Sequence, residues 1–417
     1  MRKRPCVLVL GTADTKSAEL QFLVDCILEQ DAQALVMDVG VLGLPVITPD
    51  IRNDEVALAA GSTLAAVAAL GDENAAMQSM ARGATALACQ LQRERRIDGM
   101  LALGGTMGTD LALEVAGALP IGFPKVLLST VAHSHLLPPE RIPADLIALL
   151  WAGGLYGLNE ICRATLRQAA GAVVGASRIA RPLKVQRPMV GMTSLGSTTL
   201  RYMKRLMPEL EARGYEVAVF HSSGMGGLAF ERLAAERRFE AVFDFCLQEL
   251  ANDAMGSSVT AGPNRLRGAG LAGIPQIVAP GAVDMVDYPA WGAPPAPLAG
   301  AAVHTHNRLV ASAALGASPR RELAREIALR LNAAQGPVCL LLPTDGVDEW
   351  DRPGGPMHNA TAHQAFSDML RSTLRAPVEL REVQAHINDD AFCQAALQVF
   401  DHWVQTGLVQ RAPLDQR

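Results

Sequence analysis

Short apolar runs alternate with longer segments of helical periodicity along most of this chain. The apolar runs have the length of buried strands, and the segments between them are long enough to form helices. This alternation is typical of βα units and predicts parallel strands with helices packed on them. Hydrophobic residues make up 49% of the chain and aromatic residues only 4%. The predicted core is therefore built from Ala, Leu, Val and Ile.

The alternation occurs twice, as expected for a chain of 417 residues, which exceeds the usual size of a single core. In the first half we expect strands at residues 6–10, 34–39, 99–103 and 125–129, and helices at 17–30 and 74–95. A polar, proline-containing stretch at 178–187 predicts a linker. In the second half we expect strands at 189–193, 216–220, 241–246, 276–279, 338–342 and 378–383, and a helix at 391–404. The proline-rich segment 282–302 predicts an irregular loop.

We therefore predict an α/β fold with two Rossmann-like parallel-sheet subdomains in tandem and a cleft between them. The N-terminal subdomain should span residues 1–180, and the C-terminal subdomain residues 188–417. Each half opens with a strand that ends in a loop of Gly and Thr or Ser, GTADTKS at 11–17 and GMTSLGSTT at 191–199. This similarity fits a duplicated unit, although shared βα patterns also produce short similarities of this kind.

Charge and cysteine content narrow the classes of partner. The formal net charge is −5 and no Lys/Arg-rich run is present, which argues against a nucleic-acid groove. No apolar stretch is long enough to span a bilayer. The seven cysteines are scattered and never spaced C-x-x-C, so we expect reduced thiols and a cytoplasmic location. The low charged fraction of 19% favours a homo-oligomer with a buried interface.

Three loops of the first half follow predicted strands and are rich in small hydrogen-bond donors. Ligands of parallel sheets bind where strands end and helices begin, because the free backbone N–H groups and the helix dipole favour an anion there. We expect these loops to hold the phosphates of ATP. The candidate residues are Gly11, Thr12, Asp14, Thr15 and Lys16 in the first loop, Gly104, Gly105, Thr106, Gly108 and Thr109 in the second, and Ser129 and Thr130 in the third.

None of these loops carries a complete nucleotide-binding motif. The first lacks the glycine that precedes the lysine of a Walker A motif, and none reads G-x-G-x-x-G. Each loop alone is equally compatible with a tight turn that uses glycine for steric reasons. Asp38 ends the second strand, where dinucleotide folds place a ribose-binding carboxylate, but a turn or capping role fits equally well. A Mg²⁺ ion would be held mainly by phosphate oxygens and water, with Asp14 or Asp110 as further candidates.

Polar loops also follow the strands of the second half. The turn HSSGMGG at 221–227 is similar to an anion-binding turn. Histidines and carboxylates in the later loops could form an acid–base or metal site, although each histidine alone is more often a hydrogen-bonded loop residue. The candidate catalytic residues are Asp284, His304, His306 and Asp345, and further polar residues nearby in sequence are Asp287, Asp348, His358, His363, His386, Asn388, Asp389 and Asp390.

Dispersed motifs give the chain a family resemblance over nearly its whole length. The motifs are GTADTK at 11–16, LGGTMGT at 103–109, PIGFPKVLLSTVA at 120–132, GMTSLGSTT at 191–199, FHSSGMGG at 220–227, GAVDMVD at 281–287, HTHN at 304–307 and HINDDAF at 386–392. The chain thereby resembles the ATP-binding N-terminal domain family of the tomato mosaic virus resistance protein and its bacterial relatives, long an uncharacterised protein family. The resemblance implies two Rossmann-like subdomains, ATP binding by the first, and self-association. It names a ligand but no reaction.

Three functions are compatible with these features. The first is an ATP-dependent enzyme of small-molecule metabolism, of ligase or phosphotransferase type, with Mg²⁺ and a substrate in the interdomain cleft. The second is a nucleotide-regulated protein-binding module without catalysis. The third, a nicotinamide dehydrogenase, suits the fold but lacks the glycine fingerprint. The number of ionisable residues in the loops of the second half favours the enzyme, because a module that only binds has no need for them.

Overall fold

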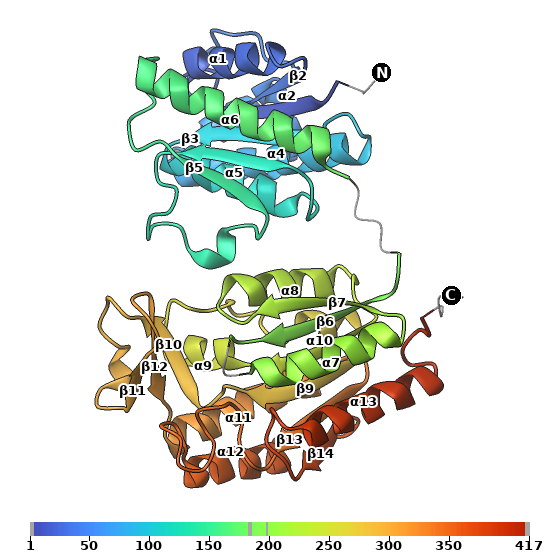
Figure 1. The fold of residues 1–417 in the computed structure, drawn as a ribbon. Coiled ribbons are helices and arrows are strands. Elements are labelled where there is room, and N and C mark those ends of the chain that lie inside the picture. Colours follow the sequence, from blue (N-terminus) through green and yellow to red (C-terminus); the bar gives the residue numbers. More distant parts are fainter. Residues whose placement is uncertain (1–3, 182–185, 197–198, 413–417) are drawn as a thin grey trace. The chain divides into compact units, whose positions relative to one another are not determined.

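The computed structural model describes residues 4–181, 186–196 and 199–412. The chain divides into two compact units, Met1–Lys184 and Val185–Arg417. Each unit contains a parallel sheet with helices on both faces (Figure 1). The predicted fold class of two Rossmann-like parallel-sheet subdomains is confirmed.

The first unit is built on a sheet of five parallel strands. In spatial order the strands are β2 (Gln33–Asp38), β1 (Cys6–Gly11), β3 (Gly99–Gly104), β4 (Lys125–Ser129) and β5 (Leu146–Leu150). The apolar runs that predicted the first four strands are buried, since helices cover both faces of the sheet. All five strands point the same way, so their carboxyl ends meet at one edge.

Among the described residues of this unit, six helices accompany the sheet. They are α1 (Ser17–Leu28), α2 (Asn53–Ala59), α3 (Leu64–Ala68), α4 (Glu73–Arg93), α5 (Thr106–Ala118) and α6 (Glu160–Ile179), with a short 3-10 turn, η1, at Pro139–Arg141. Helices α1 and α6 pack against Val7 and Val9 on one face (Figure 1). Helices α2, α4 and α5 pack against Leu8 and Leu10 on the other face. The alternation of Val and Leu along β1 thus supplies both cores.

The second unit contains a parallel sheet of six strands. In spatial order they are β14 (Glu379–Val383), β13 (Val338–Pro343), β9 (Gln276–Gly281), β8 (Ala241–Cys246), β6 (Met189–Ser194) and β7 (Glu216–His221). A small antiparallel sheet of β10 (Met285–Pro289), β12 (Val310–Ala314) and β11 (Val303–Thr305) lies beside it (Figure 1). This second sheet was not predicted.

The helices of the second unit also form two layers. They are α7 (Leu200–Ala212), α8 (Met225–Ala235), α9 (Gln248–Ala254), α10 (Gly268–Ala272), α11 (Ala317–Asn332), α12 (Ala360–Thr373) and α13 (Asp390–Gln405), with the 3-10 turn η2 at Ala296–Leu298. Helices α7 and α13 cover one face of the sheet around an aromatic cluster that includes Tyr202, Phe245 and Phe400. The other helices cover the opposite face.

Three local expectations need correction. Strand β5 was missed. It lies at the edge of the sheet, none of its residues is fully buried, and Ile147 and Leu150 are exposed. The segment 282–302 is not wholly irregular, since β10 lies within it. The start of the predicted linker at 178–187 belongs to the end of α6, and residues 182–185 of that linker lie outside the described residues.

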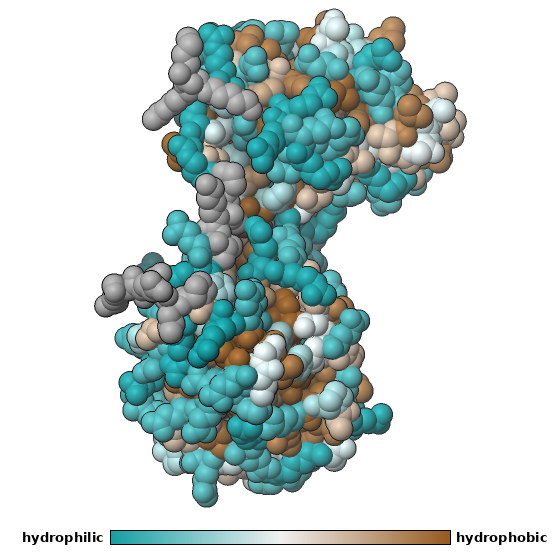
Figure 2. Space-filling view, turned by 90° about the vertical axis from the view of Figure 1, so that its right-hand side faces the viewer, coloured by the Kyte–Doolittle hydropathy of each residue, from teal (hydrophilic) through white to brown (hydrophobic). Residues whose placement is uncertain are grey.

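The surface combines hydrophilic areas with smaller hydrophobic ones, shown in teal and brown in Figure 2. In the first unit the exposed hydrophobic residues include Leu42, Leu44 and Val46, which follow β2, and Tyr156, which follows β5. Among the described residues, no helix combines the length and the apolarity needed to cross a bilayer.

Candidate functional site

A cavity of about 520 Å³ opens in the first unit at the carboxyl ends of β1 and β3. These two strands are neighbours in the sheet, but the helices that follow them pack on opposite faces, α1 on one and α5 on the other. The two loops therefore diverge and leave a space between them. Such a switch point is where open α/β sheets bind their ligands, and the volume is within the range of small-molecule sites.

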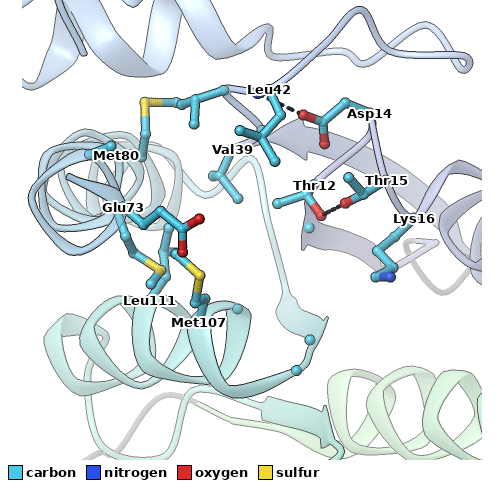
Figure 3. A pocket seen from close by; sticks show the side chains of 18 of the residues that line it. Thr12, Asp14, Thr15, Lys16, Val39, Leu42, Glu73, Met80, Met107 and Leu111 are labelled. Atoms are coloured by element: carbon cyan, nitrogen blue, oxygen red, sulfur yellow. Dashed lines mark hydrogen bonds between the residues drawn. The ribbon is translucent and has the colours of Figure 1, made fainter. Parts of the chain in front are cut away.

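The cavity brings together two of the three predicted loops. Nine of the predicted residues line it: Gly11, Thr12, Asp14, Thr15, Lys16, Gly104, Gly105, Thr106 and Gly108. The second loop leads directly into α5, whose first backbone N–H groups have no acceptor within the helix. Hydroxyl groups add to these donors, since Thr12 Oγ1 and Thr15 Oγ1 lie 2.7 Å apart at the first loop (Figure 3).

Two glycines of the second loop have different roles. A Cβ atom on Gly104 would lie 2.6 Å from the Cα atom of Gly108, so the turn into α5 requires glycine there. A Cβ atom on Gly105 would meet only Thr130 Oγ1, at 3.8 Å. Gly105 has extended backbone angles that any residue can adopt. The structure therefore needs Gly104 for its own packing, whereas Gly105 leaves open space beside the cavity.

The other four predicted residues do not line the cavity. Thr109 and Ser129 are buried and share a hydrogen bond between their hydroxyl groups at 2.7 Å, which ties α5 to β4. Thr130 lies next to Gly105 and donates its backbone N–H to the carbonyl of Gly104. Asp38 is fully buried. These residues stabilise the loops from the protein interior and do not face the cavity.

Asp38 organises the loops around it. Its Oδ1 atom accepts hydrogen bonds from the backbone N–H groups of Ala13 and Gly40, both at 2.8 Å. Burial raises the pKa of Asp38, although these two hydrogen bonds act in the opposite direction. The carboxylate thus joins the loop after β1 to the loop after β2 from inside the protein.

The charged residues of the predicted site already have partners. Lys16 Nζ donates to the carbonyl oxygen of Leu155 at 2.5 Å and lies 5.0 Å from the centre of the Tyr156 ring. Asp14 Oδ2 accepts from the backbone N–H groups of Leu42 and Gly43, so its side chain turns toward that loop (Figure 3). The second candidate magnesium ligand, Asp110, forms an ion pair with Arg141.

The opposite side of the cavity is apolar and comes from residues that sequence reasoning missed. They are Val39, Val41 and Leu42 after β2, Ala68, Ala76, Met77 and Met80 from α3 and α4, and Met107 and Leu111 from α5. The helical spacing of Ala76, Met77 and Met80 is that of an ordinary buried helix face, so it did not reveal a cavity. Glu73, in the first turn of α4, also lines this side.

The second unit places several carboxyl groups together after β9 and β13. Asp284 and Asp348 are fully buried, and neither oxygen of Asp284 accepts a hydrogen bond from a donor group among the described residues. Burial, followed by the charge of Asp284, raises the pKa of Asp348 far above its ordinary range. Burial, followed by the charge of Asp284, raises the pKa of Asp351 to about 6. A proton shared between Asp284 and Asp348 would satisfy both carboxyls.

The candidate histidines lie beside Trp350, whose backbone bonds one of these carboxyls. The rings of His304 and His306 lie 4.3 Å and 6.4 Å from the ring of Trp350, between centres, and Trp350 N donates to Asp348 Oδ1 at 2.7 Å. Asp345 accepts a hydrogen bond from the neighbouring Thr344 hydroxyl. Within residues 4–181, 186–196 and 199–412, no group of three or more His, Cys, Asp or Glu side chains is arranged to hold a metal ion.

The turn at 221–227 does bind an anion, but the anion belongs to the protein. The backbone N–H groups of Gly224 and Gly227 donate to Oε1 of the buried Glu249, at 2.6 Å and 3.2 Å. Glu249 Oε2 in turn accepts from Arg265, which is fully buried and also pairs with Asp244. The N-terminus of α8 is therefore already neutralised by an internal carboxylate.

Comparison with known proteins agrees with the motifs found in the sequence. The N-terminal domain of an uncharacterised protein family, UPF0261, matches residues 5–182, and the C-terminal domain of that family matches residues 187–404. A UPF0261 protein of Brucella melitensis is 52% identical over 97% of each chain, and one of Clostridium tetani is 33% identical over 93% of this chain and 96% of its own. The tomato protein named ToMV resistance protein Tm-1(GCR237) is 28% identical over 95% of this chain and 55% of its own length. The resemblance predicted from the motifs is thus confirmed, and the chain belongs to the uncharacterised protein family UPF0261.

Proposed function

We propose that the cavity of the first unit binds ATP. The observation that carries the proposal is the position and composition of this cavity: it lies at the switch point of a parallel sheet, with donor-rich glycine loops on one side and apolar side chains on the other. A nucleotide has the same division, since its phosphates are anionic and its base is flat and largely apolar.

The phosphates belong at the two glycine loops. The start of α5 offers backbone N–H groups that have no acceptor within the helix and the positive end of a helix dipole, both suited to an anion. Thr12 and Thr15 add hydroxyl donors, and Lys16 adds a positive charge at the start of α1. Lys16 can serve a phosphate if it exchanges the carbonyl of Leu155 for a phosphate oxygen, which is the stronger acceptor.

The base belongs at the apolar side, between the residues that follow β2 and the methionines of α4 and α5. Methionine side chains adapt to an aromatic ring and make favourable sulfur contacts with it. Asp110 is paired with Arg141, whereas Asp14 has one oxygen, Oδ1, without a hydrogen-bond partner among the described residues. We propose that Mg²⁺ accompanies the triphosphate and is held mainly by phosphate oxygens and water, with Asp14 as the remaining protein candidate.

We further propose that the bound ATP serves a reaction on a small molecule in the cytoplasm. The buried carboxyls Asp284 and Asp348 support a catalytic protein, because such a pair costs stability and is typical of functional sites. Seven cysteines present as free thiols fit a reducing compartment. The exposed edge strand β5, with Ile147 and Leu150 on its surface, supports self-association.

Substitution of Gly105 tests ATP binding at this site. Gly105→Val should fold, because the new side chain meets no atom closer than 3.8 Å at its Cβ and the backbone angles suit it. It should lower ATP affinity at least about tenfold, since the side chain occupies the space of the phosphates and covers the N–H groups of α5. Isothermal titration calorimetry with MgATP measures this effect.

Gly117→Val is the matched control. It makes the same change in the last turn of α5, the helix that Gly105 precedes, at a glycine with no atom near its Cβ position and outside the cavity lining. We expect this variant to bind ATP like the wild type. A folded Gly105→Val variant with wild-type affinity would show that the nucleotide, if bound, lies elsewhere.

A further inference from the structure

Glu73 lines the cavity together with two other acidic residues, Asp14 and Asp72. It projects from the first turn of α4, across the cavity from Thr12, Thr15 and Lys16 (Figure 3). The start of the helix is fixed by Asp72, whose side chain caps α4 by accepting from the backbone N–H of Ala75 at 2.6 Å. The Glu73 carboxylate has no hydrogen-bond or ion-pair partner in the part of the chain that the structure describes.

Glu73 is exposed to solvent, so a ligand in the cavity would replace water around its carboxylate. Its neighbours in the cavity include Val39, Met80 and Met107, which offer it no hydrogen bond (Figure 3). While the cavity holds water, the carboxylate is solvated. Once a ligand displaces that water, the carboxylate loses free energy unless the ligand supplies donors at this point.

The charges of the cavity also favour one direction of a bound nucleotide. Lys16 and the start of α5 place positive charge on one side, where the Asp14 carboxylate accepts hydrogen bonds from two backbone N–H groups, whereas Asp72 and Glu73 lie together at the other side. Phosphates carry no donors and would be repelled by Glu73. The group that faces Glu73 must therefore be a neutral part of the nucleotide that donates hydrogen bonds.

Asp38, the ribose-binding carboxylate expected from the sequence, cannot take this role. It is fully buried behind the loops, and its Oδ1 atom is occupied by the backbone of Ala13 and Gly40. The structure thus supplies another carboxylate, from a different element, on the cavity side where a ribose carboxylate is needed.

We propose that Glu73 binds the vicinal 2′- and 3′-hydroxyl groups of the ribose and selects ribonucleotides. The two oxygens of one carboxylate can accept both hydroxyls at once, whereas an amino group of the base would use a single oxygen. The inference rests on the proposed ATP site. It goes beyond that site by assigning the sugar specificity, and it predicts rejection of a nucleotide with a 2′-phosphate.

The experiment compares ligands and variants by calorimetry. The ligands are MgATP, its 2′-deoxy and 3′-deoxy forms, and MgITP, which keeps the ribose but lacks the amino group of adenine. The variants are the wild type, Glu73→Gln and Glu160→Gln. Glu160 is the matched control, because it is also the first residue of a helix, follows an Asn or Asp cap, and lies outside the cavity lining.

We expect the wild type and Glu160→Gln to bind ATP about tenfold or more tightly than at least one deoxy form, the effect of a hydrogen bond to a charged acceptor. Glu73→Gln should bind ATP more weakly and lose most of this preference. Equal binding of ATP and both deoxy forms by the wild type would overturn the inference. If Glu73→Gln still prefers ATP over the deoxy forms, the inference is overturned as well. The same holds if the wild type binds ITP more weakly than ATP but binds the deoxy forms as tightly as ATP. If the wild type binds no nucleotide at all, the proposed function fails first.

Discussion

Replacing Asp351 by Asn should stabilise the second unit at neutral pH. Asp351 is buried near two other carboxyls, Asp284 and Asp348. The charges of Arg320 and His358 lower its pKa, but by less than burial and Asp284 raise it. Its Oδ2 atom accepts a hydrogen bond from Val347 N at 3.2 Å. An Asn side chain keeps an acceptor for this N–H group and removes the charge.

The expected magnitude follows from the pKa of Asp351, which rises from an ordinary value of 3.8 to about 6 in the folded protein. A folded-state pKa above the unfolded value means that the folded form holds the proton more tightly. The contribution of Asp351 to stability is therefore most favourable below pH 3.8 and becomes unfavourable as the pH rises toward 6. At about 1.4 kcal/mol per pH unit, ionised Asp351 costs the folded state about 3 kcal/mol above pH 6.

Urea denaturation at pH 4 and pH 7.5, followed by tryptophan fluorescence, measures this effect. Three of the four tryptophans, Trp291, Trp350 and Trp403, lie in the second unit and report on its unfolding. We expect Asp351→Asn to raise the free energy of unfolding by up to about 3 kcal/mol at pH 7.5 and to change it little at pH 4.

Asp389→Asn is a control of opposite sign. Burial alone would raise the pKa of Asp389, but hydrogen bonds from Arg352 and the backbone of His386 outweigh it and lower this pKa. Asp389→Asn should therefore lose stability at pH 7.5 and recover it toward low pH. The reasoning on Asp351 is refuted if Asp351→Asn is no more stable than the wild type at pH 7.5, or if its gain is the same at both pH values.

Two further predictions concern the first unit. Lys16→Ala should weaken MgATP binding about tenfold to a hundredfold, because a charge-assisted hydrogen bond contributes about 1.5–3 kcal/mol. Lys16→Arg should retain most of the affinity. If calorimetry finds the affinity of Lys16→Ala unchanged, the phosphates do not lie at this loop. Ile147→Lys places a charge on the exposed edge strand β5 and should reduce the mass measured by light scattering to that of one chain. A wild type that is monomeric at all concentrations would contradict self-association.

The sequence by itself determined the architecture and the position of the cavity. The alternation of apolar runs and helical segments predicted parallel sheets, and the carboxyl ends of parallel strands must share an edge. The loops at 11–16 and 104–108 were therefore expected at one edge of the sheet, and the strand order, with β1 beside β3, brings them together at the cavity. Both facts follow from short-range patterns and from the geometry of one kind of sheet.

Only the tertiary structure decided which side chains face the cavity. Asp38, Thr109 and Ser129 have suitable groups, but distant partners hold them inside the protein: Asp38 bonds to Ala13, and Thr109 bonds to Ser129. A hydrogen bond across twenty or more residues depends on packing that no local pattern encodes.

The same reason explains why Glu73 and the methionines of α4 were missed. Helical periodicity tells which residues share a face, but it does not tell whether that face meets another helix or an open cavity. The cap at Asp72 and the packing of α4 on α5 place Glu73 and Met80 at the cavity. The sequence therefore located the phosphate side of the site, because glycine loops are local, whereas the side that would select the rest of the ligand is assembled by helices far apart in the chain.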